Sequence, residues 1–217
     1  MPLKKPLIAF TKFTPYHAVD LEKLHNSKGE RLETTPVTTL CRCGHSADKP
    51  YCDGTHTKID FSGEKNPDRV PDRVAEYIGK AITIVDNRGV CAHKGACTDN
   101  LPQVFIPYDQ RTDESMPWIE PDNASIKEII ETIEKCPSGA LSYQIGQRRY
   151  QDLDQEPGIT VAKNGPLEVV GGVLLKDDDA STPECTEHYC LCRCGASFNK
   201  PFCDGSHWDI YFKDDKN

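Results

Sequence analysis

The sequence has few of the features that would assign it to several common functional classes. Acidic residues outnumber basic ones, 34 to 26, and the net charge of −8 disfavours nucleic acid as the main partner, because phosphates bind basic surfaces. No apolar run approaches the length that spans a bilayer, so no membrane partner is expected. Residues 1–12 have no small-residue cleavage site after a long apolar stretch, so a secretory signal is not expected. This segment is predicted to form a strand at the edge of a sheet.

Sequence patterns typical of enzymes are also missing. The chain has no Gly-rich nucleotide-binding loop and no Ser/His/Asp pattern of a nucleophilic enzyme, so we expect it not to be an enzyme. Hydrophobic residues make up only 37% of the chain, which disfavours one large core. Small modules with thin cores usually need disulfides or bound metal.

Cysteine, by contrast, is abundant. The eleven cysteines are an odd number, which favours metal-ligand roles over a closed disulfide framework. Thiolates that bind metal must stay reduced, so the composition predicts a reducing compartment and a cytoplasmic location.

One sixteen-residue segment, 41–56, recurs at 192–207 with eleven identical positions. Both copies contain the pattern Cys-x-Cys-x8-Cys-x3-His, which offers three thiolates and one imidazole to a metal. These candidate ligands are Cys41, Cys43, Cys52 and His56 in the first copy, and Cys192, Cys194, Cys203 and His207 in the second. Ligand type alone leaves structural zinc and an iron–sulfur cluster both open.

The two segments resemble the CDGSH iron–sulfur family in spacing and identity. The resemblance rests on the three cysteines, the histidine, and a serine and proline at fixed places between them; the second copy contains the literal Cys-Asp-Gly-Ser-His at 203–207. Thr55 replaces the serine in the first copy and keeps a β-hydroxyl. The resemblance implies a [2Fe–2S] cluster in each copy, with the Cys-x-Cys pair on one iron and the last cysteine and the histidine on the other. It also implies that the two copies form an intramolecular pseudo-dimer.

Local patterns place these loops on secondary structure. Residues 37–40 read as a strand that runs directly into Cys41, so the first metal loop should leave a strand end. Asp53 is predicted to be the N-cap of a short helix with His56 in its first turn. Near the second copy, residues 159–163 and 167–175 read as a hairpin.

A different module is predicted between the two copies. Charged, proline-punctuated residues 64–73 and residues 146–158 read as linkers. We therefore expect modules at 1–68, 74–146 and 150–217, with an α+β fold: two small β-rich CDGSH modules and a small α+β ferredoxin-like module. The clearest predicted helix covers 125–136, because its isoleucines follow a 3.6-residue period and Ser125 and Glu128 form a capping box.

That helix is expected to deliver Cys136 to a third site. Cys91, Cys97 and Cys136-Pro137 resemble the ligand pattern of ferredoxins, and segment 76–143 resembles the divergent mono-cluster ferredoxin domain. Lys94 occupies the place of the missing cysteine. Three thiolates favour a [3Fe–4S] cluster; the alternative is a [4Fe–4S] cluster with His93 as fourth ligand. Cys185 and Cys190 are left as spare thiols.

Together these features predict a monomeric multi-cluster protein that transfers electrons to and from redox protein partners. The alternatives are a cluster-transfer or redox- and pH-sensing protein, and a zinc-stapled interaction module. The imidazole ligands should raise the cluster potential and make the repeated sites labile in acid, because protons compete with iron for histidine.

Overall fold

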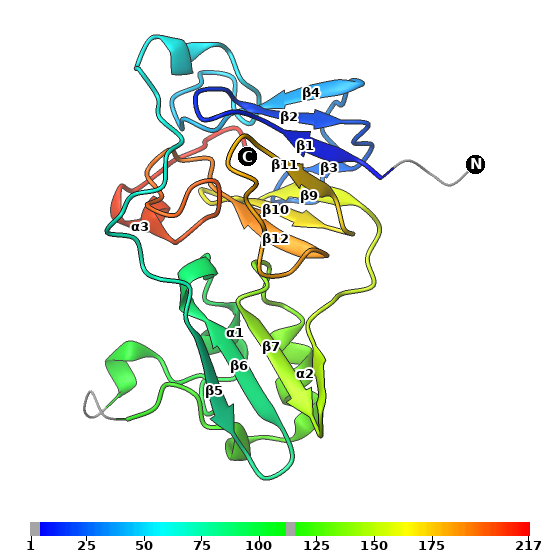
Figure 1. Cartoon of the computed structure of the whole chain (residues 1–217), viewed down its shortest axis with the longest axis vertical. Coiled ribbons are helices and arrows are strands. Elements are labelled where there is room, and N and C mark those ends of the chain that lie inside the picture. Colours follow the sequence, from blue (N-terminus) through cyan, green and yellow to red (C-terminus); the bar gives the residue numbers. More distant parts are fainter. Residues whose placement is uncertain (1–4, 112–115) are drawn as a thin grey trace.

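The computed structural model describes residues 5–111 and 116–217, which form three four-stranded sheets (Figure 1). The first sheet has the order β11 (Leu174–Lys176), β1 (Leu7–Ala9), β2 (Tyr16–Val19) and β4 (Val37–Leu40). The second has the order β12 (His188–Leu191), β10 (Leu167–Val170), β9 (Gly158–Val161) and β3 (Leu24–His25). The third has the order β5 (Val74–Ile78), β6 (Thr83–Asn87), β7 (Leu141–Ile145) and β8 (Arg148–Tyr150).

Short helices connect these strands. The α-helices are α1 (Ala96–Asn100), α2 (Ile126–Ile133) and α3 (Ser206–Asp209). The 3₁₀ turns are η1 (Thr55–Thr57), η2 (Arg88–Val90), η3 (Tyr108–Gln110) and η4 (Pro121–Asn123). No helix within the described part of the chain is both long and apolar enough to cross a membrane. We call residues 5–63 the first half, residues 74–150 the middle module and residues 158–217 the second half.

The first and second halves exchange strands. β1 of the first half pairs in parallel with β11 of the second half, and β3 of the first half pairs in parallel with β9 of the second. Both sheets therefore contain three strands from one half and one from the other. Each strand in one sheet has a counterpart in the other, and β2 and β4 correspond to β10 and β12 at the 151-residue offset of the repeated segment.

The two sheets share one hydrophobic core. Alternate residues of each strand point into it, as expected for sheets with one buried face. The buried members include Ile8, Tyr16, Leu24 and Leu40 from the first half, and Ile159, Leu167, Val169 and Leu191 from the second. Neither half buries this apolar surface alone, so each needs the other.

Two glycines bring the metal loops of the halves together. Gly44 and Gly195 both have φ of +83°, a region that favours glycine. A Cβ on Gly44 would lie 2.2 Å from the carbonyl oxygen of Cys194, and a Cβ on Gly195 would lie 2.5 Å from that of Cys43. The contact is therefore reciprocal and too close for any other residue.

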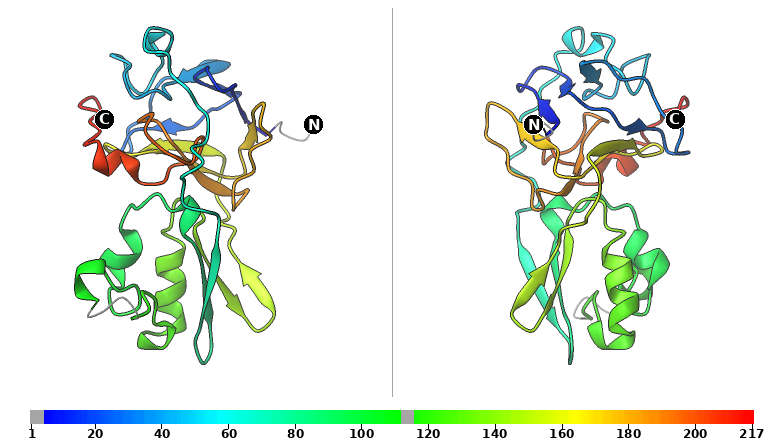
Figure 2. Two further views of the ribbon diagram at one scale, coloured as in Figure 1. Left: turned by 60° about the vertical axis from the view of Figure 1, so that its left-hand side comes forward. Right: turned by 90° about the vertical axis from the view of Figure 1, so that its right-hand side faces the viewer.

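The middle module packs α2 and two long loops against the third sheet. Its core contains Ile84, Phe105, Trp118, Ile129 and Ile133. Figures 1 and 2 show this module against the second half, with the first half on the far side.

Helix α2 begins as predicted, at a capping box in which Ser125 and Glu128 exchange hydrogen bonds. It ends at Ile133, whereas the sequence predicted Cys136. The last residues turn with i to i−3 hydrogen bonds, including one of 2.9 Å from Cys136 N to Ile133 O. Pro137 disfavours helical backbone in the residue before it. Cys136 therefore lies in a turn after the helix.

The predicted strand 167–175 is divided into β10 and β11, which lie in different sheets. Gly171 and Gly172, with φ of +74° and +67°, interrupt the extended backbone between them.

Two other predictions of local structure were wrong. β1 is an interior strand, not an edge, because β11 arrives from the second half to cover its open side. β8 lies in the predicted linker 146–158 and pairs with β7. Gly146, with φ of +61°, permits the tight turn between them, and Tyr143 and Tyr150 stack across the pair at 5.0 Å.

Candidate metal centres

Both repeated loops leave the end of a strand and are tied back to it. Cys41 follows β4, and its backbone N–H donates to the carbonyl of Pro50 at 2.8 Å. Cys192 follows β12 and makes the equivalent bond to Pro201 at 2.8 Å. The prediction that the first metal loop leaves a strand end is confirmed.

A serine and an aspartate hold each loop in the same way. Ser46 Oγ donates to the carbonyl of Tyr51 at 2.6 Å, and Asp53 accepts from the backbone N–H of Ala47 at 2.8 Å and of Thr55 at 3.0 Å. Hydrogen bonding to the Thr55 side chain is the largest cause that holds the pKa of the Asp53 carboxyl well below its usual range, and the two backbone N–H groups add to it. The second copy repeats the framework with Ser197 donating to Phe202 O at 2.7 Å, and with Asp204 accepting from Phe198 N at 2.8 Å and Ser206 N at 3.0 Å.

The aspartate is not the N-cap that the sequence predicted. Gly54 caps η1 with φ of +85°, and Gly205 caps α3 with φ of +90°. Only glycine adopts this left-handed backbone without strain, so it takes the cap position. The predicted placement of His56 in the first turn is confirmed.

The candidate ligands of each repeated site fall into two close pairs. In the first site the Cys41 and Cys43 sulfurs are 3.8 Å apart, and Cys52 Sγ is 3.3 Å from His56 Nδ1. In the second site the corresponding distances are 3.7 Å and 3.5 Å. Two thiolates on one tetrahedral ion, with bonds of about 2.3 Å, lie about 3.8 Å apart. Each Cys-x-Cys pair therefore has the spacing for one metal atom.

The two pairs of a site do not merge into one group. Among the described residues, no three cysteine or histidine ligand atoms lie mutually within 4.8 Å. A single tetrahedral ion would need all four ligand atoms within about 4 Å of one another. The ligand atoms of each site therefore form two pairs and not one four-atom group.

The sulfurs of each Cys-x-Cys pair also interact electrostatically. The neighbouring Cys43 thiol lowers the pKa of Cys41 to about 6, and the Cys41 sulfur raises the pKa of Cys43. Cys194 likewise lowers the pKa of Cys192 to about 7. The lowered pKa of one thiol in each pair favours its thiolate, which is the form that binds metal.

The two repeated sites differ in burial. Cys203 is 2% and His207 5% exposed, whereas Cys52 and His56 are only partly buried. Burial lowers the pKa of His207 below its ordinary value. The first site is thus the more open to solvent.

The arginine between the first two cysteines of each motif is a structural element that the sequence analysis did not single out. Arg193 is 1% exposed, forms an ion pair with Asp214, and donates to the carbonyls of Gly165 and Ala162 at 2.6 and 2.8 Å. Arg42 donates to Thr11 O at 2.8 Å and lies over the Phe10 ring. Its recurrence in both copies was the signal that could have revealed this role.

The middle module brings its three cysteines around one small cavity. Cys91, Cys97 and Cys136 all line it, with Arg88 and Trp118 in its wall. Burial, and to a smaller extent charge repulsion from Cys91 and Cys136, raises the pKa of Cys97 to about 12. Arg88 Nη1 lies 3.6 Å from Cys91 Sγ and supplies positive charge beside the thiols.

His93 also lines this cavity but is directed toward the second half. A Cβ on Gly205 would lie 2.7 Å from His93 Cδ2, and the backbone carbonyl of His93 accepts from Trp208 Nε1 at 3.1 Å. His93 therefore lies between the middle site and α3.

Comparison with known proteins matches the same three regions. The family model of the iron-binding zinc finger of CDGSH type matches residues 14–57 and again residues 164–208. The model of the divergent 4Fe–4S mono-cluster domain matches residues 77–145. The chain belongs to the CDGSH iron-binding family and carries a divergent 4Fe–4S mono-cluster domain between its two motifs. It is an iron–sulfur protein.

Curated relatives are similar to part of the chain. The uncharacterized protein YjdI of Escherichia coli strain K12 is 32% identical over 68 residues, which are 82% of that protein and 31% of this chain. YjdI of Escherichia coli O157:H7 matches to the same extent. No solved structure matches the chain.

Proposed function

We propose that this iron–sulfur protein is a non-enzymatic electron carrier with two [2Fe–2S] clusters and one ferredoxin-type cluster. The division of each repeated ligand set into two close pairs carries the proposal. A [2Fe–2S] cluster needs two ligands on each of two irons, whereas a zinc staple needs four ligands around one ion. The pair distances of 3.8 and 3.3 Å in the first site suit the former.

In the first site, Cys41 and Cys43 would hold one iron, and Cys52 and His56 the other. Cys192 and Cys194, and Cys203 and His207, would do the same in the second. A cluster supplies a one-electron redox couple, and a neutral imidazole in place of a thiolate raises its potential. The hydrogen-bonded serine and aspartate of each loop keep the ligands in place as the charge changes.

In the middle module, Cys91, Cys97 and Cys136 would hold a [3Fe–4S] cluster. His93 remains the candidate fourth ligand of a [4Fe–4S] alternative, but its contact with Gly205 favours a position between the two sites. Arg88 would offset the negative charge of the thiolates. The partners would be redox proteins in a reducing compartment such as the cytoplasm, and the acidic net charge favours basic partner surfaces over nucleic acid or membrane.

We also propose that the two halves form an intramolecular pseudo-dimer within a monomer. The exchanged strands β1–β11 and β3–β9, the common core and the reciprocal Gly44 and Gly195 contacts support it.

Iron, zinc, acid-labile sulfide and EPR spectra of the purified protein test the function. We expect two irons and two sulfides for each repeated site, and a paramagnetic signal from an oxidised [3Fe–4S] cluster in the middle. The reduced protein should pass electrons to an external acceptor such as cytochrome c. Zinc without sulfide would overturn the proposal and favour the interaction module.

One observation favours a second function, the transfer of a cluster to an acceptor protein. The partly exposed Cys52 and His56 leave one edge of the first site open, while the second site is closed. Incubation with an apo-ferredoxin would test this. Cluster donation is supported if the apo-ferredoxin gains iron and sulfide at the rate at which the first site loses its cluster. Retention of the [2Fe–2S] clusters at both repeated sites contradicts it.

A further inference from the structure

Three buried polar residues of the second half have no place in its metal loop. Cys185, His188 and Cys190 are only 1–2% exposed. In β12, Tyr189 and Leu191 point into the core that the two halves share. His188 and Cys190 alternate with them, so they lie on the opposite face of the strand, which the middle module covers.

Cys185 and His188 support the turn that carries Cys136. Cys185 Sγ is 3.2 Å from His188 Nδ1, and the backbone of Cys136 lies near enough to His188 to oppose the lowering of its pKa by burial. A Cβ on Gly139 would lie 2.5 Å from Cys185 Cβ and 3.1 Å from the carbonyl oxygen of His188. The Cys136-Pro-Ser-Gly turn therefore lies directly against this pair.

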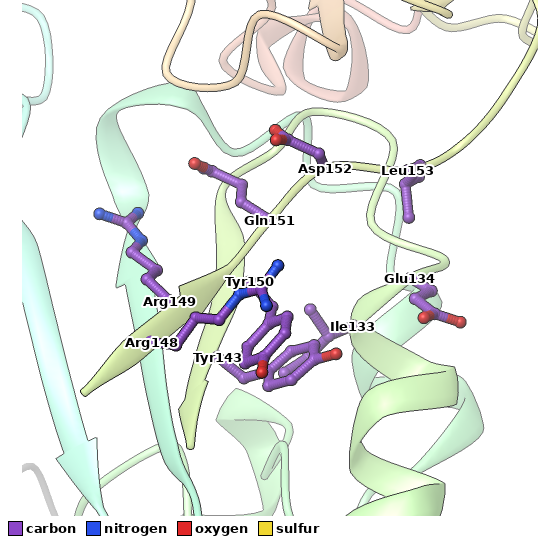
Figure 3. Close-up of a pocket in the computed structure, with 9 residues that line it drawn as sticks. All are labelled: Ile133, Glu134, Tyr143, Arg148, Arg149, Tyr150, Gln151, Asp152 and Leu153. Carbon is purple, nitrogen blue, oxygen red and sulfur yellow. The ribbon is translucent and has the colours of Figure 1, made fainter. Parts of the chain in front are cut away.

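The segment after β8 closes the same contact from the other side. Gln151 Nε2 donates to the carbonyl of Gly139 at 2.9 Å, and Asp152 Oδ1 lies 3.7 Å from Cys185 Sγ. Figure 3 shows Gln151 and Asp152 at the end of a pocket that faces the second half, away from the stacked tyrosines. Arg149 forms an ion pair with Glu184 at 2.9 Å and so extends the contact.

Cys190 meets the other ligand loop of the middle site. Together with Ala92 and Cys203 it forms a small buried cluster, so it lies between a residue next to Cys91 and a ligand of the second site. An ion pair of 2.6 Å between Lys94 and Glu168 closes the edge of this contact.

The first half has no such arrangement. At the 151-residue offset, Val37 corresponds to His188 and Thr39 to Cys190. Val37 is 50% exposed and Thr39 is partly buried. The residues that contact the middle module are therefore special to the second copy.

We infer that Cys185, His188 and Cys190 are positioning residues that hold both ligand loops of the middle site. The middle and second clusters are then direct neighbours, and the first cluster is remote from the middle one. This rests on the proposed function, since it assumes that clusters are bound. The inference gives Cys185 and Cys190, which are not among the proposed iron ligands, a role in holding the middle site against the second site.

Substitution by the residues of the first half tests the positioning. We expect His188→Val to increase the rate at which a chelator removes the middle cluster by about tenfold, because a buried hydrogen bond is lost. Both [2Fe–2S] signals should persist at the parental rate. His188→Gln keeps a donor at the same reach and should restore most of the retention, and Val37→Ala is the matched control. Cys190→Thr provides a second variant should His188→Val fail to fold.

A parental loss rate in both His188→Val and Cys190→Thr would overturn the positioning role. Equal acceleration at all three sites in every variant would also overturn it, because it indicates a general folding defect. Failure of His188→Gln to restore retention would exclude hydrogen bonding by this side chain, which contacts Cys185, as the cause.

Magnetic interaction between clusters tests which sites are neighbours. In the fully reduced protein, EPR of Cys97→Ser, which removes a middle ligand, should sharpen one [2Fe–2S] signal relative to the parent. The sharpened signal should be the one that Cys203→Ser abolishes. Sharpening of the other signal, or of neither, would refute the inference while leaving the proposed function intact. A parent protein without iron and sulfide would instead refute the proposed function itself.

Discussion

Replacing Gly44 by alanine tests how closely the two halves depend on their reciprocal contact. Alanine at φ of +83° costs about 1–2 kcal/mol, because its Cβ crowds the following carbonyl. The new Cβ would also lie 2.2 Å from Cys194 O, and overpacking of this kind adds about 1–3 kcal/mol. The expected loss of unfolding free energy is therefore about 2–5 kcal/mol, a large part of the 5–15 kcal/mol typical of a folded protein.

Gly29 offers a matched control. It has φ of +81°, but no atom lies within 4 Å of its would-be Cβ, so Gly29→Ala should lose only about 1–2 kcal/mol. Urea unfolding followed by far-UV circular dichroism gives both values by linear extrapolation. In addition, Gly44→Ala should release iron from both repeated sites, since the backbone it displaces belongs to Cys194. Equal losses in the two variants, with both sites retained, would refute the argument from close approach.

Three further predictions concern single side chains. Burial raises the pKa of Asp86 to about 6, and a folded-state pKa above the unfolded value costs stability as pH rises between about 4 and 6. Asp86→Asn should therefore stabilise the protein by about 2–3 kcal/mol at pH 8 and by almost nothing at pH 4. Thermal unfolding at both pH values would measure the difference. Acid should bleach the first cluster before the second, because His56 is partly exposed whereas burial lowers the pKa of His207. EPR during acidification follows each signal, and simultaneous loss of the two signals would contradict the burial argument. Tyr16→Phe removes hydrogen bonds of 2.9 and 3.1 Å to the second metal loop and should destabilise the protein by about 1–2 kcal/mol. The second cluster should also be lost faster than the first. Unfolding and chelator assays measure the two effects, and faster loss of the first cluster would be inconsistent with this role of Tyr16.

Local chemistry determines the features that the sequence predicted well. The repeated ligand spacing, the capping box of Ser125 and Glu128, and the hairpin of β9 and β10 all depend on residues a few positions apart. Such patterns can be recognised without knowing the rest of the fold. The cap of η1 was misassigned because aspartate and glycine are adjacent and both suit that position, and only the backbone angle at Gly54 distinguishes them.

Features that depend on distant segments could not be predicted in this way. The interior position of β1 follows from β11, whose residues are separated from it by most of the chain. Cys185 and Cys190 looked like spare thiols because their contacts, Gly139 and Ala92, belong to another module. The difference between Val37 and His188 was visible in the sequence, but its meaning depends on which face of the strand the middle module covers.

The strand exchange has a consequence for the order in which the protein can be made. The ribosome releases the first metal loop long before β11, which completes the sheet behind that loop, has been translated. The thiols of this loop therefore remain in an unfinished sheet while the middle module and the first strands of the second half are still being synthesised. Loading of the first site should accordingly follow the synthesis of β11, and a nascent chain that stops before Leu174 should hold its first four candidate ligands without a stable place for iron.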